Sequence, residues 1–152
     1  MEWLGKNSDK PFFLFLHTYQ VHYPYKSPDP YPERFLGRDS SGKKFVVQRE
    51  LRASTELFNA YGEAERKNIV GLYDAGIRYT DDALIKPVVD ALRRLGVYDR
   101  TLIVVTSDHG EEFFDHRGWT HTHGVYDELL RIPLIVKMPG SKFKASRIDP
   151  IV

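Results

Sequence analysis

The sequence predicts an α/β fold in which a mostly parallel sheet is flanked by helices. Three observations support this prediction: apolar runs at 12–16 and 102–105 that are too short for helices, a long helical repeat over 63–95, and a third apolar run at 132–136. A strand, a helix and a strand in this order form a crossover unit, which joins parallel strands and is nearly always right-handed. The chain of 152 residues has about the size of one domain.

Composition excludes several classes of protein. Hydrophobic residues make up 41% and charged residues 28% of the chain, which is typical of a globular rather than a disordered protein. The net charge of +1 gives no electrostatic reason to expect nucleic acid or an anionic membrane as a partner. The chain has no cysteine, which excludes disulfides, thiolate metal sites and a cysteine nucleophile within it and identifies no compartment. No apolar run approaches the roughly 20 residues that span a bilayer, and the first residues lack the pattern of a signal peptide.

The first expected strand, 12–16, leads into a loop. Residues 1–10 are expected to be the end of a helix or a loop. Residues 17–32 contain four prolines, which neither propagate a helix nor donate to a strand ladder, so they predict a stiff, irregular, aromatic loop. Residues 33–62 predict a polar surface excursion with a short helix at about 50–59. Loops held by a rigid scaffold often carry function, which directs attention to the first of these.

A long helix is predicted over 63–95, where apolar residues recur with a period near 3.6. Pro87 is expected to kink it or to divide it into two abutting helices, because proline lacks a backbone donor and clashes with the carbonyl four residues earlier. Gly96 is the expected stop. The adjacent Asp81 and Asp82 are expected on a solvated helix face rather than in a paired-carboxylate site.

Acidic and imidazole side chains follow the apolar run 102–105. Asp108 and His109 come directly after it, and open α/β sheets bind ligands beyond the carboxyl ends of their strands. Carboxylate oxygen and imidazole nitrogen are ligands of divalent cations, so the two residues predict a metal site. The alternative is an aspartate that caps a turn beside a hydrogen-bonded histidine. The nearby Asp115 and His116 are expected to cap a turn.

The other histidines divide into candidate site residues and structural ones. His22 lies in the proline-rich loop and has two interpretations. In the first, it acts on a substrate by donating to an anionic oxygen or by moving a proton. In the second, it is structural and packs among aromatic side chains. His17 is expected to be structural. His121 and His123 alternate in sequence, so in an extended segment at most one of them faces the site.

Four segments, in their order along the chain, resemble the sulfatase family of the alkaline phosphatase superfamily. They are the strand and loop beginning PFFLFLH, the helical segment YDAGIRYTDD, the segment TSDHGE and the segment YDELLRIPLIV. The resemblance implies a partial alkaline-phosphatase-like sandwich, an α/β fold with a mostly parallel sheet and flanking helices. It also implies that the chain is part of a metal-dependent sulfuric ester hydrolase that cleaves sulfate esters.

The same resemblance implies roles for single residues. Asp108 and His109 match ligands of one divalent ion, expected to be calcium. Manganese is the alternative, because histidine in place of asparagine at 109 occurs in some sulfatases and also in phosphonate monoester hydrolases that prefer manganese-like ions. His22 matches the histidine that contacts the sulfate and the nucleophile. His121 best matches the lysine or histidine that helps the leaving group depart, and His123 is the second candidate for this role.

Two further family motifs are absent from this chain: the acidic pair that also binds the metal, and the Cys/Ser-x-Pro-x-Arg motif whose first residue becomes formylglycine. We therefore expect residues 1–152 to be a fragment of a single sulfatase-like domain, inactive alone. The formylglycine nucleophile is expected in a missing N-terminal part, which is a candidate partner. Alternatives are a phosphatase, a phosphonate monoester hydrolase, a phosphoethanolamine transferase or a phosphomutase of the same superfamily, or a non-catalytic anion-binding module.

Overall fold

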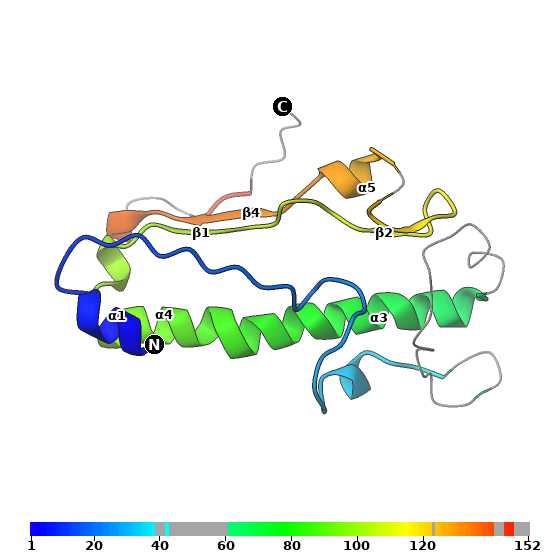
Figure 1. Ribbon diagram of the computed structural model, residues 1–152, viewed down its shortest axis with the longest axis horizontal. Coiled ribbons are helices and arrows are strands. Elements are labelled where there is room, and N and C mark those ends of the chain that lie inside the picture. Colours follow the sequence, from blue (N-terminus) through cyan, green and yellow to red (C-terminus); the bar gives the residue numbers. More distant parts are fainter. Residues whose placement is uncertain (39–41, 43–60, 123, 142–144, 148–152) are drawn as a thin grey trace.

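The structure is a computed structural model that describes residues 1–38, 42, 61–122, 124–141 and 145–147. A long helical rod lies along one side of the molecule and a pair of antiparallel strands along the other, with the N-terminal segment running between them in the view of Figure 1. No helix in these ranges is long and apolar enough to cross a bilayer. The short helix expected at 50–59 lies outside the described residues.

The rod consists of α3 (Glu63–Thr80), a π-helical turn (Asp81–Ile85) and α4 (Lys86–Arg94). The backbone N–H of Lys86 bonds to the carbonyl of Asp81, five residues back, which widens the helix directly before Pro87. This wider turn relieves the crowding that a proline ring causes in a regular helix. α3 and α4 therefore follow one another across the π turn at Pro87 (Figure 1). This agrees with the second of the two predicted alternatives, two abutting helices.

The predicted stop at Gly96 is confirmed. Gly96 has a left-handed φ of 67°, and its N–H donates to the Arg93 carbonyl at 3.0 Å, while the N–H of Val97 donates to the Leu92 carbonyl at 3.0 Å. These two bonds satisfy carbonyls that the end of a helix leaves open. The side chains of Leu92 and Val97 are buried in the same cluster, which fixes where the chain leaves the rod.

The described strands form two antiparallel pairs: β1 (Ile103–Thr106) with β4 (Leu134–Lys137), and β2 (Glu112–Phe113) with β3 (Trp119–Thr120). Helix α5 (Asp127–Leu130) leads into β4. The structure thus has a strand, a helical turn and a strand where the sequence predicts them, over 101–106, 126–131 and 132–136.

The mostly parallel sheet that the sequence predicts is not present among the described residues. Segment 12–16 runs extended (Figure 1) but pairs with no described strand, and Phe13 and Phe15 expose 86% and 75% of their surface. Val104 and Leu134 in β1 and β4 are exposed as well, so the prediction that these runs are buried is wrong for the described chain. The physical reason is that burial and parallel pairing need neighbouring strands, and the described residues supply none for 12–16.

Two hydrophobic clusters fasten other segments to the rod. One joins α1 (Glu2–Asn7) to the end of α4 through Leu4, Ala91, Leu92 and Val97. The other lies against α3 and contains Tyr25, Ile69, Leu72, Phe114 and Trp119. The second cluster fixes the loop after segment 12–16 and the loop after β1 against the same helix, and thereby places them side by side.

Candidate functional site

The loop that follows β1 crosses the backbone of α5 at Gly110. The N–H of Gly110 donates to the carbonyl of Leu129 at 2.8 Å. A Cβ atom at Gly110 would lie 1.9 Å from the carbonyl oxygen of Glu128, so only glycine fits without displacing one of the two segments. This close approach fixes the backbone between His109 and Glu111.

A buried carboxylate organises the turn between β2 and β3. Glu112 is fully buried, and its Oε1 accepts the backbone N–H groups of His116 and Gly118 at 2.9 and 2.8 Å. Left-handed φ angles occur at three non-glycine residues of this stretch: 75° at Phe114, 66° at Arg117 and 76° at Thr120. Each costs on the order of 1 kcal/mol, which burial of Trp119 helps to offset. The turn returns the chain so that His121 lies beside the loop after β1.

Three of the predicted site histidines lie together. The rings of His109 and His121 are 3.9 Å apart between centroids and inclined by 31°. His22 meets His121 at 5.0 Å and 70°. His22 comes from the proline-rich loop and the other two from either side of the β2–β3 pair, so the site combines segments far apart in sequence.

The three imidazoles have a common hydrogen-bonding pattern. In each ring Nδ1 lies close to an oxygen: the Tyr23 carbonyl for His22 at 2.6 Å, the Gly110 carbonyl for His109 at 2.7 Å, and Glu111 Oε1 for His121 at 2.8 Å. Carbonyl and carboxylate oxygens only accept, so the Nδ1 atoms must donate. In each of the three rings, Nε2 is therefore the nitrogen that can bind a ligand or a proton.

Glu111 belongs to this site although the sequence did not single it out. Its side chain is only 5% exposed, and Oε2 accepts a hydrogen bond from the Tyr25 hydroxyl at 2.9 Å. The Trp119 indole N–H in turn donates to the Tyr25 oxygen at 3.1 Å. Burial, followed by the charge of Glu111, raises the pKa of Tyr25 above its usual range, so Tyr25 remains a neutral donor.

The two missed residues differ in how visible they are in the sequence. Glu111 directly follows the segment Asp108–Gly110, so proximity to a metal motif was an available signal. Tyr25 lies 86 residues from Glu111 in the chain, and no sequence pattern around Tyr25 predicts the contact.

Asp108 and His109 are arranged as two ligands of one cation could be. Asp108 Oδ1 lies 3.8 Å from His109 Nε2. Metal–ligand distances of about 2.3–2.6 Å for Ca²⁺ allow two ligands of one ion to lie up to about 5 Å apart. The backbone N–H of Asp108 itself, then the imidazole and N–H of His109, hold the pKa of Asp108 below its usual range, and His17 adds to this effect. An ionised oxygen and a free ring nitrogen fit a divalent ion.

The pair formed by His116 and Glu128 lies apart from the three imidazoles. His116 Nδ1 is 2.6 Å from Glu128 Oε1, and its ring stacks on Tyr126 at 3.7 Å and 8°. Ligand atoms of these two residues and of Glu112 come within 4.8 Å of one another. Since Glu112 already holds the turn, we interpret this group as structural. Asp115 accepts the N–H of the residue two earlier at 3.4 Å, in line with the predicted turn.

The remaining predicted residues have simpler positions. His123 lies outside the described residues, so its candidate role stays a prediction. The ring of His17 packs at 4.8 Å from Tyr19. Asp82 is on the rod surface, where Arg78 donates to both of its oxygens at 2.9 and 3.0 Å, as expected for a solvated helix face.

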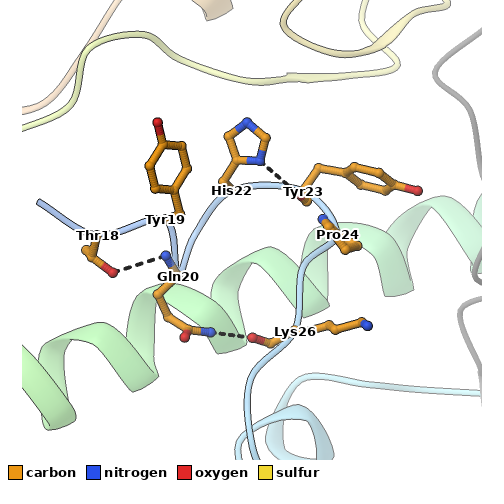
Figure 2. Close-up of a pocket in the computed structure, with 7 residues that line it drawn as sticks. All are labelled: Thr18, Tyr19, Gln20, His22, Tyr23, Pro24 and Lys26. Carbon is orange, nitrogen blue, oxygen red and sulfur yellow. Dashed lines mark hydrogen bonds between the residues drawn. The ribbon is translucent and has the colours of Figure 1, made fainter.

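An open pocket of about 560 Å³ lies in the proline-rich loop, lined by residues between Thr18 and Lys26. Figure 2 shows the rings of Tyr19 and His22 on one side of the loop, while the amide of Gln20 reaches back to the carbonyl of Lys26. The backbone N–H of Gln20 bonds to the Thr18 hydroxyl at 3.1 Å. His22 is thus the residue that connects this pocket with the imidazole group.

Comparison with known proteins gives consistent matches over the chain. The model of the sulfatase family matches residues 1–151. Arylsulfatase K of Bos taurus is 29% identical over 170 residues, covering 92% of this chain and 30% of that protein. The multifunctional alkaline phosphatase superfamily protein PehA of Trinickia caryophylli is also 29% identical over 170 residues, covering 98% and 33%. The chain therefore spans about a third of the length of these relatives.

Among solved structures, the phosphonate monoester hydrolase of Agrobacterium radiobacter matches with a TM-score of 0.65 and 24% identity, over 91% of this chain and 31% of that one. This likeness shows the fold that the two share. The superfamily predicted from the sequence is supported by the match to the sulfatase family model, and no parallel sheet is seen in the described ranges.

Proposed function

The chain belongs to the sulfatase family, and from this membership we propose that it forms part of a metal-dependent sulfuric ester hydrolase. The observation that carries the proposal is the meeting of His22, His109 and His121 beside the ionised Asp108. Two loops far apart in sequence supply these groups. Such a convergence of imidazole and carboxylate groups suits the binding and cleavage of an anionic ester.

Each imidazole has a proposed task that follows from its bonding. His22, whose Nδ1 is bound to a carbonyl, donates from Nε2 to an oxygen of the sulfate group when the ring carries hydrogen on both nitrogens. His121, held by Glu111 through Nδ1, gives a proton from Nε2 to the leaving-group oxygen when the ring carries hydrogen on both nitrogens, and it is then left with hydrogen on Nδ1 alone. Such proton transfer contributes about 10²–10⁴-fold to a rate. His123 is the second candidate for this task.

Asp108 and His109 would hold the divalent ion, for which calcium is proposed and manganese is the alternative. When bound, the ion supplies polarisation of the substrate oxygens and stabilises negative charge that develops during ester cleavage. Calcium prefers oxygen ligands, so the imidazole of His109 is the feature that keeps manganese in consideration. Two protein ligands are fewer than such ions take, so we propose that further ligands come from outside residues 1–152.

The nucleophile is proposed to lie outside this chain as well. Residues 1–152 contain no cysteine and no serine in a Ser-x-Pro-x-Arg motif, so a formylglycine nucleophile would belong to another part of the same domain. That part is the proposed partner of this chain. We accordingly propose that residues 1–152 alone are inactive or nearly so.

Substrate and metal assays on the protein that contains this chain test the proposal. We expect hydrolysis of nitrophenyl sulfate in the presence of calcium or manganese, with a rate at least about 100-fold lower after His22→Ala or Asp108→Ala. His116→Ala is the matched control and should leave the rate within a few-fold. Hydrolysis by residues 1–152 alone, unchanged by either substitution, would contradict the proposal. Calorimetry that detects no divalent-ion binding would favour a non-catalytic module.

A phosphonate or phosphate monoester hydrolase is the second candidate. Histidine rather than asparagine at position 109 favours it, together with the similarity to a multifunctional member of the alkaline phosphatase superfamily. Comparison of kcat/KM for a nitrophenyl sulfate and a nitrophenyl phenylphosphonate distinguishes the two. A higher value for the phosphonate with manganese would select the second candidate.

A further inference from the structure

The carboxylate of Glu111 is buried, and each of its oxygens has its own donor. Oε1 faces His121 Nδ1 at 2.8 Å, and Oε2 accepts the Tyr25 hydroxyl at 2.9 Å. The side chain is 5% exposed. A buried carboxylate is costly unless it is hydrogen-bonded, so an arrangement that satisfies both oxygens on two specific partners calls for an explanation beyond the metal and anion roles above.

We propose that Glu111 is a positioning residue that fixes the ring orientation and the tautomer of His121. The inference rests on the proposed function for its consequence, namely presentation of His121 Nε2 to the leaving group. Its structural content stands on the hydrogen bonds alone. Glu111 touches neither substrate nor ion in this scheme and acts through His121.

The orientation follows from which atoms can donate. An ionised carboxylate only accepts, so the partner nitrogen of His121 must carry hydrogen. With the hydrogen on Nδ1, a neutral His121 has its lone pair on Nε2, across Cε1 from the bonded nitrogen. Nε2 is therefore the atom that takes up the proton later given to the leaving group. The ring itself lies between His109, at 3.9 Å, and His22, at 5.0 Å. Turning the ring over would break the bond to Glu111.

Tyr25 and Trp119 prevent Glu111 from turning instead. The Tyr25 hydroxyl donates to Glu111 and accepts from the Trp119 indole, so its hydrogen has only one direction available. Tyr25 and Trp119 are both buried in the cluster on α3. Trp119 thus donates to Tyr25 and Tyr25 to Glu111 from the core, while His121 donates to Glu111 from the site, so the donors converge on the carboxylate.

The His116–Glu128 pair provides a control within the same molecule. It has the same kind of bond, Nδ1 to a glutamate Oε1 at 2.6 Å, but its histidine stacks on Tyr126. Its carboxylate is more exposed than that of Glu111. A change in this pair should leave the candidate site unaffected.

Glu111→Gln is the sharpest test, because glutamine has the same shape but only one accepting oxygen. It cannot accept from both His121 and Tyr25. If its amide NH₂ faces His121, Nδ1 must accept and the hydrogen moves to Nε2; if it faces Tyr25, that bond is lost. Glu128→Gln is the matched control.

Long-range ¹H–¹⁵N spectra of the ¹⁵N-histidine-labelled chain read the tautomer directly. At about pH 8.5, well above the ordinary histidine pKa, we expect the Nδ1–H pattern for His121 in the wild type. Glu111→Gln should remove or strongly reduce this pattern, and Tyr25→Phe should weaken it, whereas Glu128→Gln should leave it intact. A wild-type His121 in the Nε2–H form overturns the inference, and so does an Nδ1–H pattern that persists both in Glu111→Gln and in Glu111→Ala, which has no accepting oxygen in either orientation.

Kinetics of the protein that contains this chain separate positioning from a merely structural role. Glu111→Gln should lower kcat by about 10–100-fold, the usual cost of losing an orienting partner. KM should change by no more than about two-fold, since binding is left intact, and the loss should grow for poorer leaving groups. Equal losses for all leaving groups would overturn the catalytic consequence. If Glu111→Gln changes the His121 spectrum but the protein has no esterase activity, the proposed function is contradicted while the tautomer assignment is supported.

Discussion

Two histidine–glutamate pairs in one stretch of chain have nearly the same bond and very different surroundings. His121 and Glu111 are 17% and 5% exposed, and their nitrogen–oxygen distance is 2.8 Å. His116 and Glu128 are 45% and 22% exposed, with a distance of 2.6 Å. The first histidine lies among other imidazoles, and the second lies on a tyrosine ring.

The difference shows that the bond alone does not define a functional pair. In the His116 pair, the carboxylate of Glu128 links the turn between β2 and β3 to α5, and we interpret this contact as structural. In the His121 pair the second carboxylate oxygen is bound by Tyr25, and the imidazole ring lies beside the rings of His109 and His22. Under the proposed function, the groups around its unbonded nitrogen are therefore what would distinguish His121 from His116.

Removal of the two imidazoles should give the largest difference between the pairs. In the protein that contains this chain, His121→Ala should lower kcat for a sulfate ester by about 10²–10⁴-fold, because the leaving group loses its proton donor. His116→Ala should lower it by no more than a few-fold. Initial rates at saturating substrate measure both. Equal losses would mean that both histidines act through folding, and the comparison would fail.

Removal of one hydroxyl should reveal the support behind Glu111. Tyr25→Phe leaves a buried carboxylate oxygen and an indole N–H without their partner, which should cost about 1–3 kcal/mol of unfolding free energy. Tyr73→Phe is the control, since Tyr73 packs against the same ring and the structure gives its hydroxyl no bond to Glu111; it should change stability by less than about 0.5 kcal/mol. Urea unfolding followed by tryptophan fluorescence measures both. A larger effect at Tyr73 would contradict the assignment.

The more exposed pair should contribute little to stability. At about pH 5, below the ordinary histidine pKa, Glu128→Gln should lower the unfolding free energy by about 0.2–1 kcal/mol, the usual range for an ion pair near the surface. High salt should reduce this difference, because it screens exposed charges. Urea unfolding at two salt concentrations provides the measurement. A salt-independent loss well above this range would show that the pair is not a surface pair.

A carboxylate on the rod provides the baseline for a pair with no packing at all. The hydrogen bond from Lys86, and less so the charges of Lys86, Arg93 and Arg94, hold the pKa of Asp90 below its usual range. A carboxyl with a lowered pKa in the folded state stabilises the protein above its unfolded pKa of about 3.9, and this contribution is lost as pH falls through the folded pKa. Wild type and Asp90→Asn should therefore differ slightly in urea midpoint at pH 6 and converge toward pH 2. A difference in urea midpoint that grows as the pH falls would have the opposite sign and would contradict the lowered pKa of Asp90.

Local patterns in the sequence predicted much of the fold and of the site. The helical repeat and Gly96 located the rod and its end, because periodicity and a left-handed stop are properties of consecutive residues. Asp108 and His109 could be proposed as cation ligands for the same reason, since an acid beside an imidazole after an apolar run is a local feature. His22 and His121 were located through family resemblance rather than through spacing.

Partners far apart in the chain could not be predicted in the same way. The contact of Glu111 with Tyr25 spans 86 residues, and neither neighbourhood encodes it. The π turn before Pro87 is a response of the whole helix to one residue. The prediction that 12–16 is buried was wrong for the described chain. An apolar run indicates that a segment can be buried, but it does not indicate whether a neighbouring strand is present to cover it.

Gly110 has a consequence for how this site can be altered or transplanted. The loop after β1 and the backbone of α5 touch at a point where not even a methyl group fits. Substitutions that reshape one segment must therefore be matched in the other, and a graft of the proposed cation ligands into another scaffold needs both segments. In directed evolution the two segments should accept changes as a coupled unit, with 110 itself as the position that tolerates no variation.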